Sequence, residues 1–172
     1  MMRRLLLACL ALGLATPLAA AELNLVVQIP EQKVAEYHRP YVAVWIERTD
    51  RSVAAQLAVW YAQKDSKEGS GGKWLPDLRQ WWRRGGRDLD LPVDGVSGAT
   101  RPAGQHQLRF VGGQPPLDTL AAGDYVLAVE AAREVGGREV VRIPFHWPVT
   151  TTQHLSGQGT SELGVVSLDI NP

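Results

Sequence analysis

The residues best suited to chemistry lie in one short stretch, DGVSGATRPAG, at residues 94–104. It holds a carboxylate, Asp94, and two hydroxyls, Ser97 and Thr100, among small residues. A slim loop of this composition can present a hydroxyl to another enzyme, which must activate it because an alkyl hydroxyl is a poor nucleophile. The stretch therefore indicates either a hydroxyl that accepts a chemical group or a loop that is needed only for its backbone.

The purely structural interpretation explains every residue of this stretch. Its glycines permit positive φ, and Pro102 fixes its own φ. Asp94 and Ser97 can bond nearby amides in a turn. The stretch lacks the lysine of a phosphate-binding P-loop, and it is not a G-x-S-x-G nucleophile elbow. On composition alone it predicts a structured loop that leads into a strand at residues 106–110.

The stretch from Asp94 to Thr100 resembles the D-x-x-[ST]-G-A-[ST] acceptor motif of proteins that ApbE-type flavin transferases modify outside the cytoplasm. The resemblance implies that FMN is joined to Thr100 through a phosphoester. It also implies that Asp94 is the acidic residue at the start of the motif and that the small residues before the acceptor are Ser97, Gly98 and Ala99. Pro102 stands where the same families often have Ser or Thr.

Three tryptophans just upstream, Trp74, Trp81 and Trp82, lie among Arg79, Arg83, Arg84 and Arg87, and this aromatic and basic patch suits a flavin ring and its phosphate. Trp81 and Trp82 belong to the segment KWLPDLRQWWRRGG, in which Leu75, Leu78 and Trp82 follow helical spacing. Indoles stack on planar rings, and arginines suit a phosphate. We therefore expect Trp81 and Trp82 to contact the cofactor. The alternative is that they pack a short helix, near residues 75–84, onto the rest of the fold.

No catalytic or metal-binding constellation is visible elsewhere. The four histidines, His38, His106, His146 and His154, are scattered and lack the spacing of metal ligands. No pattern of nucleophile and base can be read from the sequence. We therefore predict no catalytic residue and no metal site, and a protein that is not a catalyst by itself.

The N-terminus predicts export. A charged MMRR, a short apolar run and Ala19-Ala20-Ala21 form a secretory signal peptide at residues 1–21. Cleavage after Ala21 removes the single cysteine and leaves 151 residues with 16 basic and 18 acidic side chains, a net charge of −2. That balance argues against nucleic-acid binding. No later segment is apolar and long enough to cross a membrane. Residues 22–172 are thus expected to form one periplasmic domain without disulfides.

Alternating apolar residues predict the elements that position the candidate site. The segments at 23–29, 39–47, 53–62, 124–134, 138–148 and 161–170 read as strands. Residues 49–52 and 135–137 are the expected turns of two hairpins. Strands of this length and spacing predict an all-β protein, a single antiparallel sandwich of Ig-like type with one short helix.

Four segments in order, RPYVAVWIE, KWLPDLRQWWRR, DGVSGATRPAG and GDYVLAVEAARE, resemble a family of predicted periplasmic proteins of unknown function. That resemblance implies an association with PepSY-type membrane proteins and flavin transferases. The leading hypothesis is an exported electron-transfer accessory with FMN on Thr100, served by a flavin transferase and a PepSY-type membrane reductase. The alternative is a non-catalytic periplasmic binding or scaffold sandwich in which the SGAT loop is structural.

Overall fold

The structure is a computed structural model that describes residues 20–64 and 69–172. The predicted signal peptide lies outside the described residues, apart from Ala20 and Ala21. The first strand, β1 (Glu22–Ile29), begins directly after the expected cleavage point.

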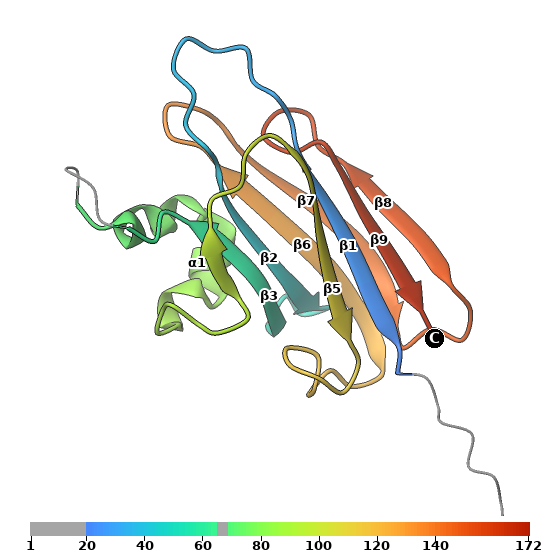
Figure 1. The fold of residues 1–172 in the computed structure, drawn as a ribbon. Helices are drawn as coiled ribbons and strands as arrows, with labels where there is room; N and C mark the ends of the chain where they lie inside the picture. Colours follow the sequence, from blue (N-terminus) through green and yellow to red (C-terminus); the bar gives the residue numbers. More distant parts are fainter. Residues whose placement is uncertain (1–19, 65–68) are drawn as a thin grey trace, which may run out of the picture.

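Two β-sheets packed face to face make up the fold (Figure 1). The four-stranded sheet has the order β5 (Gly104–Val111), β1, β9 (Val165–Asn171) and β8 (Gln153–Gln158). The five-stranded sheet has the order β4 (Ser97–Ala99), β3 (Val53–Tyr61), β2 (Tyr41–Arg48), β6 (Gly123–Ala132) and β7 (Arg138–Trp147). The predicted all-β sandwich is confirmed, with one difference: β4 pairs with β3 in parallel.

Alternation along the strands builds the core between the sheets. In β1 the four apolar residues Leu23, Leu25, Val27 and Ile29 are all buried, and the residues between them face outward. Successive side chains of a strand point to opposite faces, so one register places all four in the core. They pack against inward residues of β2, β6 and β9.

Both predicted hairpins are present. β2 and β3 pair in antiparallel fashion around residues 49–52, where Asp50 Oδ1 accepts the Ser52 N–H at 2.8 Å. β6 and β7 pair through ten residues each and turn at residues 133–137. Val135 in this turn has φ of 53°, which is costly for a β-branched residue.

A helical layer covers the outer face of the five-stranded sheet (Figure 1). It consists of the 3₁₀-helix η1 (Gly71–Asp77), the short helix α1 (Arg79–Arg84) and the 3₁₀ turn η2 (Gly86–Asp88). Leu75, Leu78 and Trp81 are buried there against Trp45 and Val59 of the sheet. The predicted helix near 75–84 is thus confirmed as the junction of η1 and α1.

A buried carboxylate fastens this layer to the sheet. Glu130 of β6 is 0 % exposed and accepts the backbone N–H of Gln80 at 3.0 Å and of Trp81 at 2.8 Å. Arg138 lies 3.7 Å away. Burial raises the pKa of Glu130, although these hydrogen bonds and the nearby arginines favour its charged form. The side chain therefore supplies the acceptors that the first turn of α1 lacks within the helix.

A second carboxylate, Glu139 of β7, holds the loop between β8 and β9. It accepts the backbone N–H groups of Thr160 at 2.6 Å, Ser161 at 3.0 Å and Leu163 at 2.9 Å. Burial raises the pKa of Glu139, but these bonds outweigh that effect and lower it from 4.5 to about 2.

This lowered pKa predicts acid sensitivity. The folded pKa of Glu139 lies below its unfolded value. Its contribution to stability is therefore fully present above pH 4.5 and is lost as the pH falls toward 2. After a discount for partial exposure, we expect a loss of about 2 kcal/mol. Urea unfolding of the parent and Glu139→Gln at about pH 6 and about pH 3 measures it. An equal acid-induced loss in both proteins would contradict the assignment.

Within the described residues, no helix combines the length and the hydropathy needed to cross a membrane.

Candidate functional site

The DGVSGAT stretch forms a turn followed by an edge strand. The Val96 and Ser97 amides donate to the Val93 carbonyl at 3.2 and 2.8 Å, which closes the turn. Ser97 Oγ accepts the Val93 N–H at 2.9 Å. The hydroxyl of Ser97 is therefore already used to hold the turn.

The middle of the stretch is shaped by Trp60. Gly98 pairs in register with Trp60 across β3 and β4, and a Cβ on Gly98 would lie 3.2 Å from the indole. After the strand, the Arg101 guanidinium lies over the same indole at 5.3 Å from the ring centroid. Gly95 and Gly104 adopt positive φ, as their glycine character predicted. Much of the motif thus has a packing role.

Thr100 follows the last residue of β4 and lines a cavity of about 910 Å³, which we call the end cavity. Its walls come from the β1–β2 loop, the segment after β3, η1 and the β6–β7 turn. In Figure 1 the β1–β2 loop and the β6–β7 turn lie at the upper end of the sandwich, and the helical layer lies at the left. The lining includes Tyr37, Arg39, Lys64, Trp74, Arg79 and Thr100. A volume of this size is typical of ligand pockets.

The Thr100 hydroxyl has no hydrogen-bond partner among the described residues, 20–64 and 69–172. Thr100 is half-buried. Ala99 before it and Arg101, Pro102 and Ala103 after it are exposed. An enzyme approaching this edge of the sheet would meet the hydroxyl on an accessible segment.

The other predicted site residues are not gathered around Thr100. Asp94 is exposed in the turn before β4, at the opposite end of that strand, and does not line the end cavity. Trp81 is fully buried, and its Nε1 donates to Gln56 at 2.8 Å. Trp82 is half-buried against the same cluster, with its ring 6.2 Å from that of Trp81. Both tryptophans pack the helical layer onto the sheet, and neither lines the end cavity.

Of the three tryptophans in the predicted aromatic and basic patch, the one that does line the cavity is Trp74. It is 42 % exposed, and Lys73 Nζ lies 4.6 Å from its ring centroid. Trp74 lies outside the helically spaced row of Leu75, Leu78 and Trp82, and unlike Leu75 and Leu78 it is exposed. Its exposure was visible only once η1 was placed.

Contacts at the start of η1 set the position of Trp74. The Tyr41 hydroxyl donates to the Gly71 carbonyl at 3.0 Å, and burial raises the pKa of Tyr41. Ser70 Oγ accepts the Gly72 N–H at 3.3 Å and caps the 3₁₀-helix. Gly71 itself rests on the end of β3, since a Cβ there would lie 1.8 Å from the Ala62 carbonyl oxygen. The wall that carries Trp74 is therefore fixed to the sheet.

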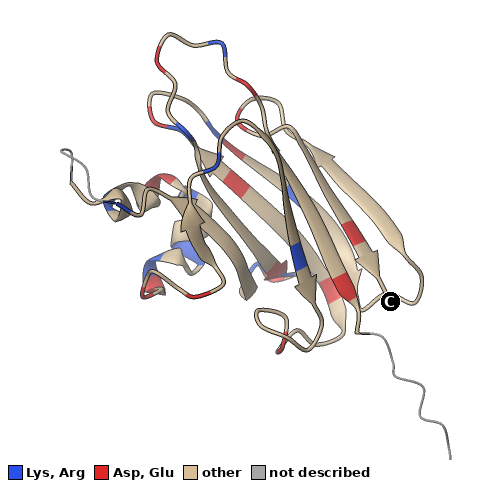
Figure 2. Ribbon diagram, in the orientation of Figure 1, with Lys and Arg blue, Asp and Glu red and all other residues tan. Residues whose placement is uncertain are grey.

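Among the described residues that line the end cavity, basic side chains outnumber acidic ones. The acidic residues are Asp77 and Glu134; the basic residues are Arg39, Lys64, Arg79, Arg133 and Arg138. Figure 2 shows both signs interspersed along the loops at this end of the sandwich. The excess of positive charge among the described lining residues is thus local rather than a property of the whole face.

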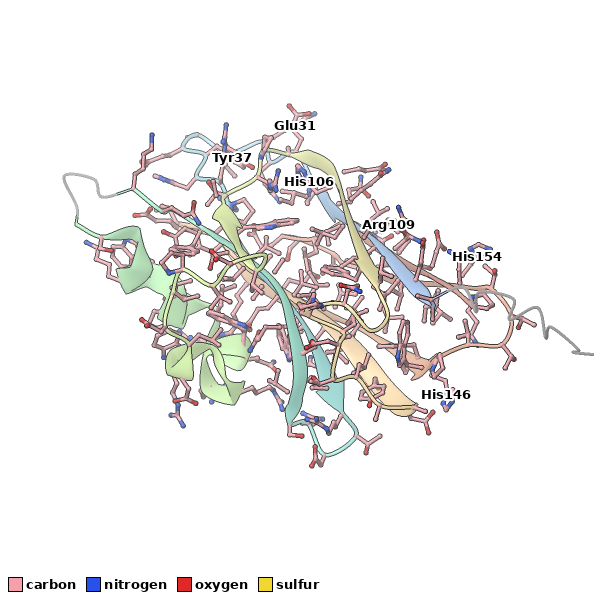
Figure 3. The ribbon with its side chains drawn as sticks, turned by 60° about the horizontal axis from the view of Figure 1, so that its bottom comes forward. Glu31, Tyr37, His106, Arg109, His146 and His154 are labelled. Atoms are coloured by element: carbon pink, nitrogen blue, oxygen red, sulfur yellow. The ribbon has the colours of Figure 1, made fainter. Side chains whose placement is uncertain are left out.

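The histidines have separate partners. His146 bonds Asp124 at 2.8 Å, and His154 bonds Asp169 at 2.7 Å, both as exposed pairs. In Figure 3, His106 and Tyr37 lie at one end of the molecule and His146 at the other. Within the part of the chain that the structure describes, no three His, Cys, Asp or Glu residues come together in a group that could hold a metal ion.

Comparison with known proteins gives one match. A family model described as "Predicted periplasmic protein (DUF2271)" matches residues 22–165. The description agrees with the periplasmic location predicted from the N-terminus, and the match begins at the first residue after the expected cleavage point. No curated protein and no solved structure matches the chain.

Proposed function

Since the chain belongs to the DUF2271 family of predicted periplasmic proteins, we propose that it is an electron-transfer accessory that carries FMN on Oγ of Thr100. One observation carries the proposal: the Thr100 hydroxyl, unbonded within the described residues, lines a cavity of about 910 Å³. The likeness of residues 94–100 to a flavin acceptor motif supplies the chemistry.

Attachment of FMN requires an outside enzyme and FAD. Oγ of Thr100 attacks the phosphorus on the flavin side of the FAD pyrophosphate. The bond from that phosphorus to the bridging oxygen breaks, AMP leaves, and the hydroxyl proton passes to a base of the flavin transferase. The proposal assigns no base to this chain, because an alkyl hydroxyl needs an external activating site.

The position of Thr100 suits such an enzyme. It follows a three-residue strand at the edge of a sheet, so no neighbouring strand covers it on the outer side. The exposed residues on both sides of it allow a partner to surround the hydroxyl. A phosphoester bond also keeps the cofactor on an exported protein, from which free FMN would diffuse away.

In the proposed cycle the bound FMN takes electrons from a PepSY-type membrane reductase and passes them to a periplasmic acceptor. The chain acts as a carrier and contributes no catalytic side chain to either step. The flavin transferase and the PepSY-type reductase are the partners that this role requires.

Intact-mass spectrometry tests the attachment. Co-expression with a flavin transferase should add one FMN, minus one water, to the exported protein. Thr100→Ala should abolish the gain, and Thr100→Ser should keep it because the hydroxyl remains. Thr151→Ala, a change at an exposed threonine outside the end cavity, is the matched control and should gain FMN as the parent does. An unmodified parent, or a gain that survives Thr100→Ala, would refute the proposal.

A scaffold role is the second candidate, and specific contacts favour it. Ser97 Oγ holds the turn, and the space beside Trp60 explains Gly98. These roles need no cofactor. Under this alternative the co-expressed protein keeps its unmodified mass.

A further inference from the structure

The exposed apolar surface of the protein concentrates at the end cavity. Five large hydrophobic side chains are exposed among the described residues, and three of them line this cavity: Tyr37, Trp74 and Val135. Tyr37 is 40 % exposed and Trp74 is 42 % exposed. Lys73 covers one face of the Trp74 ring, so the opposite face is the one left for a partner. Aromatic surface gathered in a cavity indicates a binding site for a flat apolar group.

The same cavity holds three basic side chains without a salt bridge to a described residue, alongside the carboxylates of Asp77 and Glu134. Arg39, Lys64 and Arg79 form no ion pair within residues 20–64 and 69–172. Of the two carboxylates in the lining, Glu134 lies 3.5 Å from His38. A guanidinium offers a fork of N–H donors that matches a phosphate.

A buried donor without an acceptor lies in the same wall. The side chain of Arg133 is 6 % exposed and pairs with Glu162 through Nε at 2.8 Å. Its Nη1 has no hydrogen-bond partner among the described residues. An unpaired buried N–H group is costly, and an anion bound in the cavity would lower this cost by its field even without direct contact.

We infer that the end cavity binds a planar aromatic ligand that carries a phosphate, with the ring on Trp74 and the anionic group on Arg79 and its basic neighbours. The inference rests on the proposed function, because that function identifies FMN as the ligand with which the cavity is tested. It goes beyond that function because it assigns the non-covalent contacts to η1 and α1, which lie outside the acceptor motif. A cofactor on Thr100 would then be enclosed rather than exposed on the loop.

Tethering sets the affinity that this arrangement needs. A ligand joined to Thr100 by a short flexible link is present at an effective concentration of about 1 mM. A dissociation constant for free FMN below about 1 mM is therefore enough to keep a tethered flavin in the cavity. Measurement with free FMN must reach this range.

The test uses the exported protein with Thr100→Ala, which cannot be modified at this position. Free FMN is titrated up to about 1 mM, and binding is followed by calorimetry and by the anisotropy of flavin fluorescence. Riboflavin, which lacks the phosphate, is the second probe. The variants are Trp74→Ala, Trp74→Phe and Arg79→Gln. Arg83→Gln is the control, since Arg83 is exposed on the same helix but does not line the cavity.

We expect saturable binding of FMN and binding of riboflavin about tenfold weaker, because riboflavin cannot use the arginines. Trp74→Ala should weaken FMN about tenfold, whereas Trp74→Phe keeps most of the affinity because the ring remains. Arg79→Gln should cost about tenfold, and Arg83→Gln less than about threefold. Absence of saturable binding, or equal affinities for the Trp74→Ala and parent forms, would overturn the inference.

The two proposals fail in different ways. If the co-expressed parent gains no mass while the Thr100→Ala protein binds free FMN through Trp74, the attachment is wrong and the cavity assignment stands. If the parent gains FMN on Thr100 while free FMN does not bind, the attachment stands and the cavity assignment is wrong.

Discussion

Replacing Glu130 with alanine should reduce the free energy of unfolding by about 4 kcal/mol, because it leaves buried amide donors without an acceptor. The carboxylate is 0 % exposed and accepts the N–H groups of Gln80 and Trp81 at the start of α1. Neither amide has a partner within the helix, since both lie in its first turn. Urea denaturation at neutral pH measures the loss.

Two further variants separate this role from a general effect of charge. Glu134 is an exposed carboxylate four residues after Glu130, and its Oε2 lies 3.5 Å from His38 Nδ1. Glu134→Ala should change the free energy of unfolding by less than about 0.5 kcal/mol. Glu130→Gln keeps the shape and one acceptor oxygen, and should lose less than Glu130→Ala. Equal losses for Glu130→Ala and Glu134→Ala would contradict the assignment.

The pH dependence provides an independent check on Glu130. Burial raises its folded pKa above the unfolded value of 4.5, so stability is highest below 4.5 and declines as the pH rises through the folded value. Glu130→Gln should remove this decline. The contribution of Glu139 changes with pH in the opposite direction, because it increases as the pH rises from about 2 to 4.5. The two carboxylates can therefore be distinguished in one series of unfolding curves.

Replacing Gly71 with alanine should cost about 3 kcal/mol and displace the wall of the end cavity. The new Cβ would lie 1.8 Å from the Ala62 carbonyl oxygen and 2.7 Å from the Ala62 carbonyl carbon, both of which are backbone atoms. No rotamer change can relieve a clash with backbone, so η1 must move away from β3. Because η1 carries Trp74, we also expect weaker binding of free FMN to the Gly71→Ala form.

The neighbouring glycine is the matched control for this substitution. A Cβ on Gly72 would meet the Ser70 hydroxyl at 3.5 Å, an ordinary contact, so Gly72→Ala should change stability by less than about 1 kcal/mol. Urea denaturation gives the free energies, and near-ultraviolet circular dichroism reports on the tryptophans of the helical layer. Similar losses for the two alanine variants would show that η1 is not held by Gly71.

The substitutions at Glu130 and Gly71 also test the binding site, because these two residues hold the helical layer on the sheet. Glu130 holds the start of α1, and Gly71 holds the start of η1. Between them lie Trp74 and Arg79, the residues assigned to the ring and the phosphate. Loss of either anchor should therefore weaken flavin binding without touching the Thr100 hydroxyl.

The strands of the sandwich could be predicted from sequence because alternation is a local property. Leu23, Leu25, Val27 and Ile29 share one face in any strand that contains them. The exceptions are instructive. β8, with the sequence QHLSGQ, has almost no apolar residues to alternate and was not predicted. β4 has three residues and exists because β3 supplies a partner in parallel.

The sequence by itself determined the export signal, the sandwich class, the helical segment and Thr100 as a candidate acceptor. The tertiary structure decided what surrounds that hydroxyl. It joined the β1–β2 loop, η1 and the β6–β7 turn, which are far apart in the chain, into one cavity with Thr100. It also separated the three tryptophans of the predicted patch, because Trp74 lines the cavity whereas Trp81 and Trp82 pack the helical layer onto the sheet. Local patterns show which residues face inward, but the order in which strands pair decides which loops meet, and that order depends on long-range packing.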